Sequence, residues 1–177
     1  MLGRLLRLWL CRRGIAATEF ALVLPLMVLV LAGTAELGNA LLLDRKVTRA
    51  AHIASDLVAQ EETVDTAVLN DFLDAVERVL VPYPTNAIRI SLTSVWRDPD
   101  TDSLQVDWSI ARNTSALSTG SAYVLPTDMV PVIGESVIVA EIEYAYSPLY
   151  ADLITGGLIL SDRAYLRPRR TTRVTRL

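Results

Sequence analysis

Residues 12–36 of this chain read RRGIAATEFALVLPLMVLVLAGTAE. Residues 15–35 contain only three polar side chains, those of Thr18, Glu19 and Thr34. A helix of 21 residues measures roughly 32 Å, which is close to the hydrocarbon thickness of a bilayer. The stretch therefore predicts one membrane-spanning helix over residues 15–35, preceded by a short basic leader, residues 1–14.

Three kinds of N-terminal membrane signal fit a basic leader that is followed by an apolar span. A cleaved secretory signal would use the small residues 33–35 as its cleavage site and release a soluble protein that begins at Glu36. An uncleaved signal anchor would hold an outer domain at the membrane but would leave Gly14 and Glu19 without a role. The third kind is defined by the residues around that glycine and that acid.

The string RRGIAATEF, residues 12–20, resembles a prepilin peptidase site. In such a site basic residues precede a glycine, and the chain is cut after the glycine. Cleavage after Gly14 would make Ile15 the first residue of the mature chain and Glu19 the fifth. The candidate site residues are therefore the basic Arg12 and Arg13, the cleaved pair Gly14 and Ile15, and the motif residues Glu19 and Phe20.

A longer stretch of sequence indicates which family of prepilin-like proteins the chain resembles. The segment ATEFALVLP at residues 17–25, followed by ELG at 36–38, is similar to the TadE-like family, the minor pseudopilins of bacterial tight-adherence (Tad, Flp-type) pili. The segments YAYSPLY at 144–150 and YLRPR at 165–169 are more loosely similar to such proteins. The second pseudopilin of the system, TadF, has a similar size, so the roles of TadE and TadF both remain open.

The resemblance implies a structural subunit that helps to assemble a pilus used in surface adherence. Its implied partners are a prepilin peptidase, the other pilins and pseudopilins of the Tad system, the inner-membrane assembly platform and the lipid bilayer. The implied location is the bacterial inner membrane, with the N-terminus in the cytoplasm and residues 36–177 in the periplasm. A membrane-anchored periplasmic binding or scaffold protein without a pilus role is the alternative.

Two residues of the span have physical consequences of their own. Glu19 lies four residues, roughly 6 Å along a helix, from the Ile15 nitrogen, which cleavage would convert to an ammonium group. By resemblance to pilins, pairing of this acid with an amino terminus favours docking into a filament; otherwise Glu19 is a chance acid at the membrane boundary. Pro25 removes one helical hydrogen bond, which predicts a helix kink, although proline is also common in membrane helices.

Periodicity predicts the organisation of the rest of the chain. Apolar residues at helical spacing indicate one long helix over about 15–60 and a second amphipathic helix over about 63–80. Alternating apolar and polar residues then indicate antiparallel strands near 88–92, 104–110, 136–146 and 158–166. We expect an α+β, pilin-like head on a helical stalk, with an irregular connection over 112–135.

Charged segments of the head allow more than one interpretation. The loop at residues 98–102 reads DPDTD, whose acid spacing is suggestive of calcium, but Ser103 and Ser109 replace the glycine and glutamate of an EF-hand. The C-terminal tail is rich in arginine. We expect it to be solvated and partly frayed, with contact to lipid phosphates or to an acidic partner as the alternative.

Composition excludes several classes of protein. High apolar content with only 8 Gly and 8 Pro excludes a disordered chain, and a net charge of −3 argues against nucleic acid as a partner. The one cysteine, Cys11, precedes the span, so no disulfide framework is available. The one histidine, His52, is expected on a polar helix face. We therefore expect no enzyme activity, no cofactor and no metal site.

Overall fold

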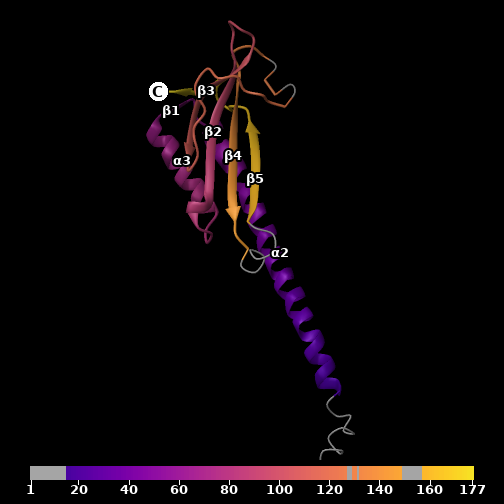
Figure 1. Cartoon of the computed structure of the whole chain (residues 1–177). Coiled ribbons are helices and arrows are strands. Elements are labelled where there is room, and N and C mark those ends of the chain that lie inside the picture. Colours follow the sequence, from indigo (N-terminus) through magenta and orange to yellow (C-terminus); the bar gives the residue numbers. More distant parts are fainter. Residues whose placement is uncertain (1–14, 127–128, 131, 149–156) are drawn as a thin grey trace, which may run out of the picture.

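The computed structural model describes residues 15–126, 129–130, 132–148 and 157–177. Figure 1 shows a long helix, α2 (Ile15–Ala59), that projects far beyond a head built from the remaining elements. The head contains α3 (Thr66–Val79), the 3-10 turn η2 (Thr85–Ala87) and the strands β1 (Thr63–Val64), β2 (Ile88–Arg97), β3 (Leu104–Arg112), β4 (Ser136–Tyr146), β5 (Leu158–Leu166) and β6 (Thr175–Arg176). The predicted α+β class is confirmed.

Helix α2 has two halves with different environments. Residues 15–31 are all exposed, and the first fully buried side chain is that of Leu43. From there a buried face recurs every three or four residues at Val47, Ala50, Ala54 and Val58, as expected for one face of a helix. The long helix that periodicity predicted is thus confirmed. It continues without interruption through Pro25, and a kink at that residue stays a prediction.

Helix α3 begins later than the sequence predicted. Its N-cap is Asp65, whose side chain accepts a hydrogen bond from the Val68 amide at 2.8 Å. The two residues before the cap belong to β1, which pairs in parallel with β6 near the C-terminus. Residues 63–64 are therefore extended because they meet a partner strand that lies more than 100 positions away, which local periodicity does not report.

Within the described residues, four strands form an antiparallel sheet in the order β3-β2-β4-β5. One face of this sheet is covered by α2 and α3 (Figure 1). Side chains that point toward the helices are buried and apolar, among them Ile90, Leu92, Ala140 and Ile142. The alternation that predicted the strands is thus the alternation between this core face and the opposite face.

The opposite face of the sheet is apolar at one end and polar at the other. Val95, Val137 and Val139 pack there against Leu125 and Val130 of the connection between β3 and β4. The rest of this face carries paired polar side chains. The connection is irregular, as predicted. Its later part covers the end of the sheet at which β2 finishes and β4 begins, whereas its first residues border the polar part of this face.

The C-terminal tail is docked on the head, so the expectation of a solvated and frayed tail is wrong. Val174 is fully buried, and its carbonyl accepts a hydrogen bond from Trp108 Nε1 at 2.8 Å. Arg173 donates from Nε and Nη2 to the Asp107 carboxylate at 2.8 and 2.5 Å, and its guanidinium lies 3.7 Å from the centre of the Trp96 ring. One apolar residue and one bidentate, stacked arginine suffice to order a short segment.

Candidate functional site: the stalk and the base of the head

The free end of α2 carries the predicted assembly motif. Ile15 opens the helix, and the Thr18 hydroxyl donates to the Ile15 carbonyl at 2.8 Å. Glu19 and Phe20 follow, and both are exposed. Gly14, Arg12 and Arg13, which complete the predicted cleavage site, lie outside the described residues.

The exposed half of α2 is long enough and apolar enough to cross a bilayer. Among the described residues it is the one helix that meets this criterion, and none of its most apolar window is buried in the head. A continuous apolar surface of this length is far larger than the patches that soluble monomers expose. Figure 1 shows this half standing clear of the head along its whole length. It suggests a single-pass membrane anchor.

Two polar contacts fix the head to the stalk where α2 enters it. Tyr146 at the end of β4 donates its hydroxyl to Glu36 at 2.5 Å. Ten residues further along α2, Lys46 Nζ donates to the Val81 carbonyl at 2.5 Å and lies 5.4 Å from the centre of the Tyr83 ring. Burial, with the adjacent Glu36 carboxylate, raises the pKa of Tyr146 to about 12.

These anchoring residues were not identified from the sequence. From the sequence, Glu36 was noted in the ELG segment and as a possible start of a secreted protein, and Tyr146 was noted in a predicted strand and in the looser C-terminal similarity. The partners are 110 positions apart, so nothing local connects them. The available signal was weak: a charged residue directly after an apolar span, and tyrosines near the end of a predicted strand.

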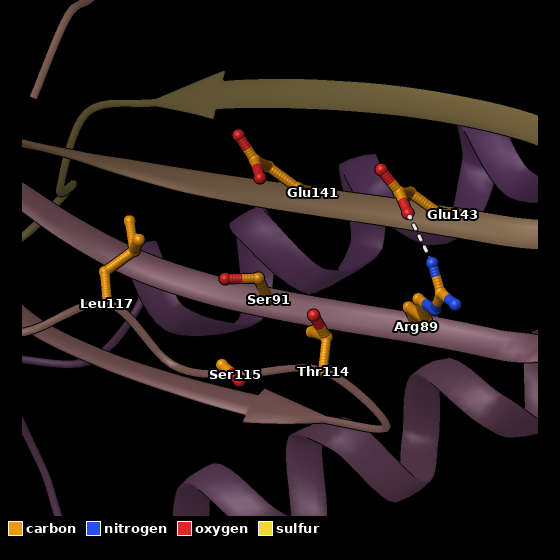
Figure 2. A pocket seen from close by; sticks show the side chains of 7 residues that line it. All are labelled: Arg89, Ser91, Thr114, Ser115, Leu117, Glu141 and Glu143. Carbon is orange, nitrogen blue, oxygen red and sulfur yellow. Dashed lines mark ion pairs between the residues drawn. The ribbon is translucent and has the colours of Figure 1, made fainter.

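A shallow polar hollow lies on the open face of the sheet, with a volume of about 100 Å³. Figure 2 shows Glu141 and Glu143 on one strand and Arg89 and Ser91 on its neighbour, facing the segment that follows β3. Arg89 pairs with Glu143 at 3.6 Å. Glu141 receives Arg163 Nε at 2.9 Å and the Tyr123 hydroxyl at 3.0 Å. Both acids are thus paired with neighbouring side chains of the sheet and the connection.

The acids of the 98–102 loop stabilise the hairpin between β2 and β3. The Asp98 carboxylate accepts hydrogen bonds from the Thr101 hydroxyl at 2.8 Å and from Gln105 Nε2 at 3.2 Å. The bond from Thr101 is the main cause of a lowered pKa at Asp98. Asp102 pairs with Arg97 Nε at 2.7 Å. In the described part of the chain, no cluster of three or more His, Cys, Asp or Glu side chains is arranged to hold a metal ion.

Comparison with known proteins gives one match, and it covers most of the stalk helix α2. The fold and the exposed helix together define a class, an α+β head on a candidate single-pass membrane anchor. A family model described as TadE-like protein matches residues 14–56. Over these residues the chain is similar to the TadE-like family, which confirms the resemblance drawn from the motif. No curated protein and no solved structure matches the chain.

The first and last residues of the matched segment show which part of the chain resembles the family. It begins at the predicted cleavage glycine and ends within the buried half of α2, so it contains the apolar span and the motif acid. The β-sheet and the C-terminal tail lie beyond it. The TadE-like family is associated with Tad pili, so the match suggests a Tad pilus-associated protein.

Proposed function

We propose that this protein is a minor pseudopilin, a structural subunit that assists the assembly of a Tad pilus used in surface adherence. One observation carries the proposal. The glycine-to-glutamate spacing of residues 14–19 stands at the start of an exposed apolar helix, inside the segment that matches the TadE-like family. A plain membrane anchor needs the apolar helix but has no use for that spacing.

The proposed processing step acts at the junction of leader and span. A prepilin peptidase hydrolyses the peptide bond between Gly14 and Ile15, and the leader leaves with its basic residues Arg12 and Arg13. Glycine suits the cleaved position because it has no side chain to obstruct an extended, closely approached backbone. The product is a mature chain that begins with the charged amino group of Ile15 and has Glu19 as its fifth residue.

The proposed assembly step uses that new charge. In hydrocarbon a carboxylate at a helix centre costs about 2.5–3.5 kcal/mol, and less near the interface. Pairing Glu19 with the amino group of a neighbouring mature pilin removes part of this cost when the subunit moves from lipid into a helical bundle. Phe20 and the following apolar side chains then pack against other pilins, and a bend at Pro25 adjusts the helix to that packing.

The proposed topology follows from the same parts. The leader lies in the cytoplasm, residues 15–35 span the inner membrane once, and residues 36–177 form a periplasmic head. Partners are the prepilin peptidase, the pilins and pseudopilins of the Tad system, the assembly platform and the bilayer.

The N-terminus of the protein from its native membranes tests this proposal directly. We expect peptide mass spectrometry to find a chain that begins at Ile15, and to find Met1 instead when the peptidase is absent or when Gly14 is replaced by Val. A start at Met1 in the unmodified protein would indicate an uncleaved anchor. A start at Glu36 would indicate a secreted protein, and either result would contradict the proposal.

A further inference from the structure

The end of the head that faces the free half of α2 exposes apolar side chains. Val81 is 60% exposed, Leu158 is 49% exposed and Ile159 is 63% exposed. They come from two separate parts of the chain, the turn after α3 and the start of β5. Isolated exposed apolar residues are ordinary on protein surfaces, so their position relative to α2 decides whether they matter.

Register and hydrogen bonds place these residues beside the stalk. Leu158 pairs with Tyr146 across β4 and β5, and Tyr146 is bonded to Glu36 of α2. Ile159 is the next residue of β5, so its side chain lies at the same end of the sheet but on the face opposite to α2. Val81 is held at the same end, because its carbonyl accepts the Lys46 ammonium of α2. We call the three residues Val81, Leu158 and Ile159 the base of the head.

The base is continuous with the apolar surface of the span. Glu36 directly follows the predicted span, so the bond to Tyr146 ties the head to α2 where roughly 32 Å of helix has already been used to cross the hydrocarbon. Leu37, Leu41 and Leu42, which lie between that point and the first buried residue of α2, are exposed as well. Among residues 37–42 only Asn39 has a polar side chain, so this part of α2 offers little polar surface between the span and the head.

Three polar groups at this end have partners within the described part of the protein. The Tyr146 hydroxyl bonds Glu36, the Tyr144 hydroxyl donates to the Pro84 carbonyl at 3.0 Å, and Lys46 bonds a carbonyl. Buried polar groups without partners oppose insertion into a water-poor region, and here those groups have partners. The base can therefore enter a membrane interface without leaving these groups unpaired.

We propose that the base of the head rests in the headgroup region of the leaflet in which α2 ends, with Val81, Leu158 and Ile159 in contact with lipid. The head is then held against the membrane at a fixed orientation before assembly. A second protein is a poorer occupant, because a stable protein interface involves about 20–30 residues on each side. This proposal rests on the proposed function only in requiring α2 to span the bilayer.

Fluorescence depth measurements on the full chain test this contact. The natural Cys11 is replaced by Ser, and single cysteines labelled with NBD are placed at position 159, at position 81 or at Val124, a 93% exposed residue of the connection near the other end of the sheet. Each variant is reconstituted at one copy per phosphatidylcholine/phosphatidylglycerol nanodisc. Near-ultraviolet circular dichroism first establishes that each variant keeps the fold.

We expect iodide quenching at positions 159 and 81 to be at least about threefold weaker than at position 124, because the interface excludes the aqueous anion. Lipids that carry a doxyl group near the headgroup should quench the first two positions and not the third. Equal iodide quenching at all three positions would overturn the proposal.

Two further arms separate the possible failures. A label at Leu29, in the middle of the predicted span, should be quenched by deep doxyl lipids. Quenching at position 29 without protection at 159 and 81 would refute the lipid contact and leave the span intact, whereas failure at position 29 would refute the span itself. Protection at 159 that appears only with two or more copies per nanodisc would assign the surface to a neighbouring subunit and overturn the proposal.

Discussion

At the scale of single residues, Glu19 is the residue whose proposed role is most open to test. We expect Glu19→Gln to reduce incorporation into pili at least about tenfold, which corresponds to about 1.4 kcal/mol. Loss of the charge removes the partner of a neighbouring amino terminus, while the span remains apolar enough to insert. The measurement is the amount of the protein in sheared pilus fractions relative to membranes.

The matched control for this variant is Glu62→Gln, which removes an exposed acid of the head. We expect it to behave like the unmodified protein. Equal incorporation of the Glu19 variant and the control would show that the acid has no part in assembly. That outcome would favour a membrane-anchored scaffold or binding protein that has no pilus role.

Arg173 is the residue through which the tail is held, and its removal should be costly. We expect Arg173→Ala to lower the free energy of unfolding by about 1–3 kcal/mol, because Asp107 loses a bidentate partner and Trp96 loses a stacked cation. Arg170→Ala, at an exposed position of the same tail, should change it by less than about 0.5 kcal/mol. Denaturant unfolding in detergent micelles measures both, and equal effects would contradict the docked tail.

At the scale of elements, the contact between α2 and the sheet depends on small side chains. Ala50, Ala51 and Ala54 are fully buried on the face of the helix that meets the head. We expect Ala54→Leu to destabilise the head by about 1–3 kcal/mol, because the added atoms would force the helix away from the core. His52→Leu, on the exposed face of the same helix, is the control and should be nearly neutral. Thermal unfolding followed by circular dichroism compares the two.

The bond between α2 and β4 should also appear in the pH dependence of stability. Because the pKa of Tyr146 is raised to about 12, the unfolded chain loses this proton from about pH 10 while the folded chain keeps it. The contribution of Tyr146 to stability is therefore constant well below pH 10 and falls as the pH rises toward 12. Tyr123 and Tyr144 also have raised pKa values, because burial disfavours their phenolates, so they add to the fall.

Tyr146→Phe isolates the contribution of this one tyrosine. We expect the free energy of unfolding of the variant to fall less steeply between pH 10 and 12. The difference in slope corresponds to the release of up to one proton fewer per chain on unfolding. It should also be less stable at neutral pH, because Glu36 loses a donor. An unchanged slope in urea titrations across this pH range would show that the bond to Glu36 does not form.

The elements also show which parts of the fold the sequence can predict. The strand boundaries near 136–146 were predicted because alternation of side chains reflects one buried and one open face, and 158–166 was predicted from a weaker signal. The start of α3 was predicted wrongly, and so was the C-terminal tail, which is docked on the head and not frayed. Both depend on the pairing of Thr63 with Thr175 and on Arg173 reaching Asp107, contacts that join distant positions and leave no local periodicity.

The candidate site divides in the same way. Gly14, Ile15 and Glu19 could be proposed from the sequence because a motif for a protease or a membrane occupies a short, continuous stretch of chain, and their roles stay a prediction. Glu36, Tyr146 and Lys46 were missed because their roles exist only once the sheet has been laid against α2. A recognition motif can be identified from the sequence alone, whereas a contact between distant residues can be identified only from the fold.

For the whole molecule, we expect the stability of the head to be independent of the membrane-spanning part of the stalk. Among the described residues, the fully buried core side chains all lie at or beyond Leu43, so residues 15–35 contribute no packing to the head. We expect a fragment of residues 36–177 to fold without the span, since it retains both Glu36 and Lys46 with their partners on the head. Its urea unfolding midpoint should match that of the head in the full chain, with both measured in the same detergent.

The same fragment should be unable to enter pili, because the proposed assembly contacts lie in the part that it lacks. It should still bind weakly to vesicles through Val81, Leu158 and Ile159, which remain exposed without the stalk. Co-sedimentation with phosphatidylglycerol vesicles, compared between the fragment and its Ile159→Ser variant, measures this binding. A fragment that is unfolded in solution would contradict separability and would mean that the lipid-facing half of α2 stabilises the head by ordering the helix that the sheet packs against.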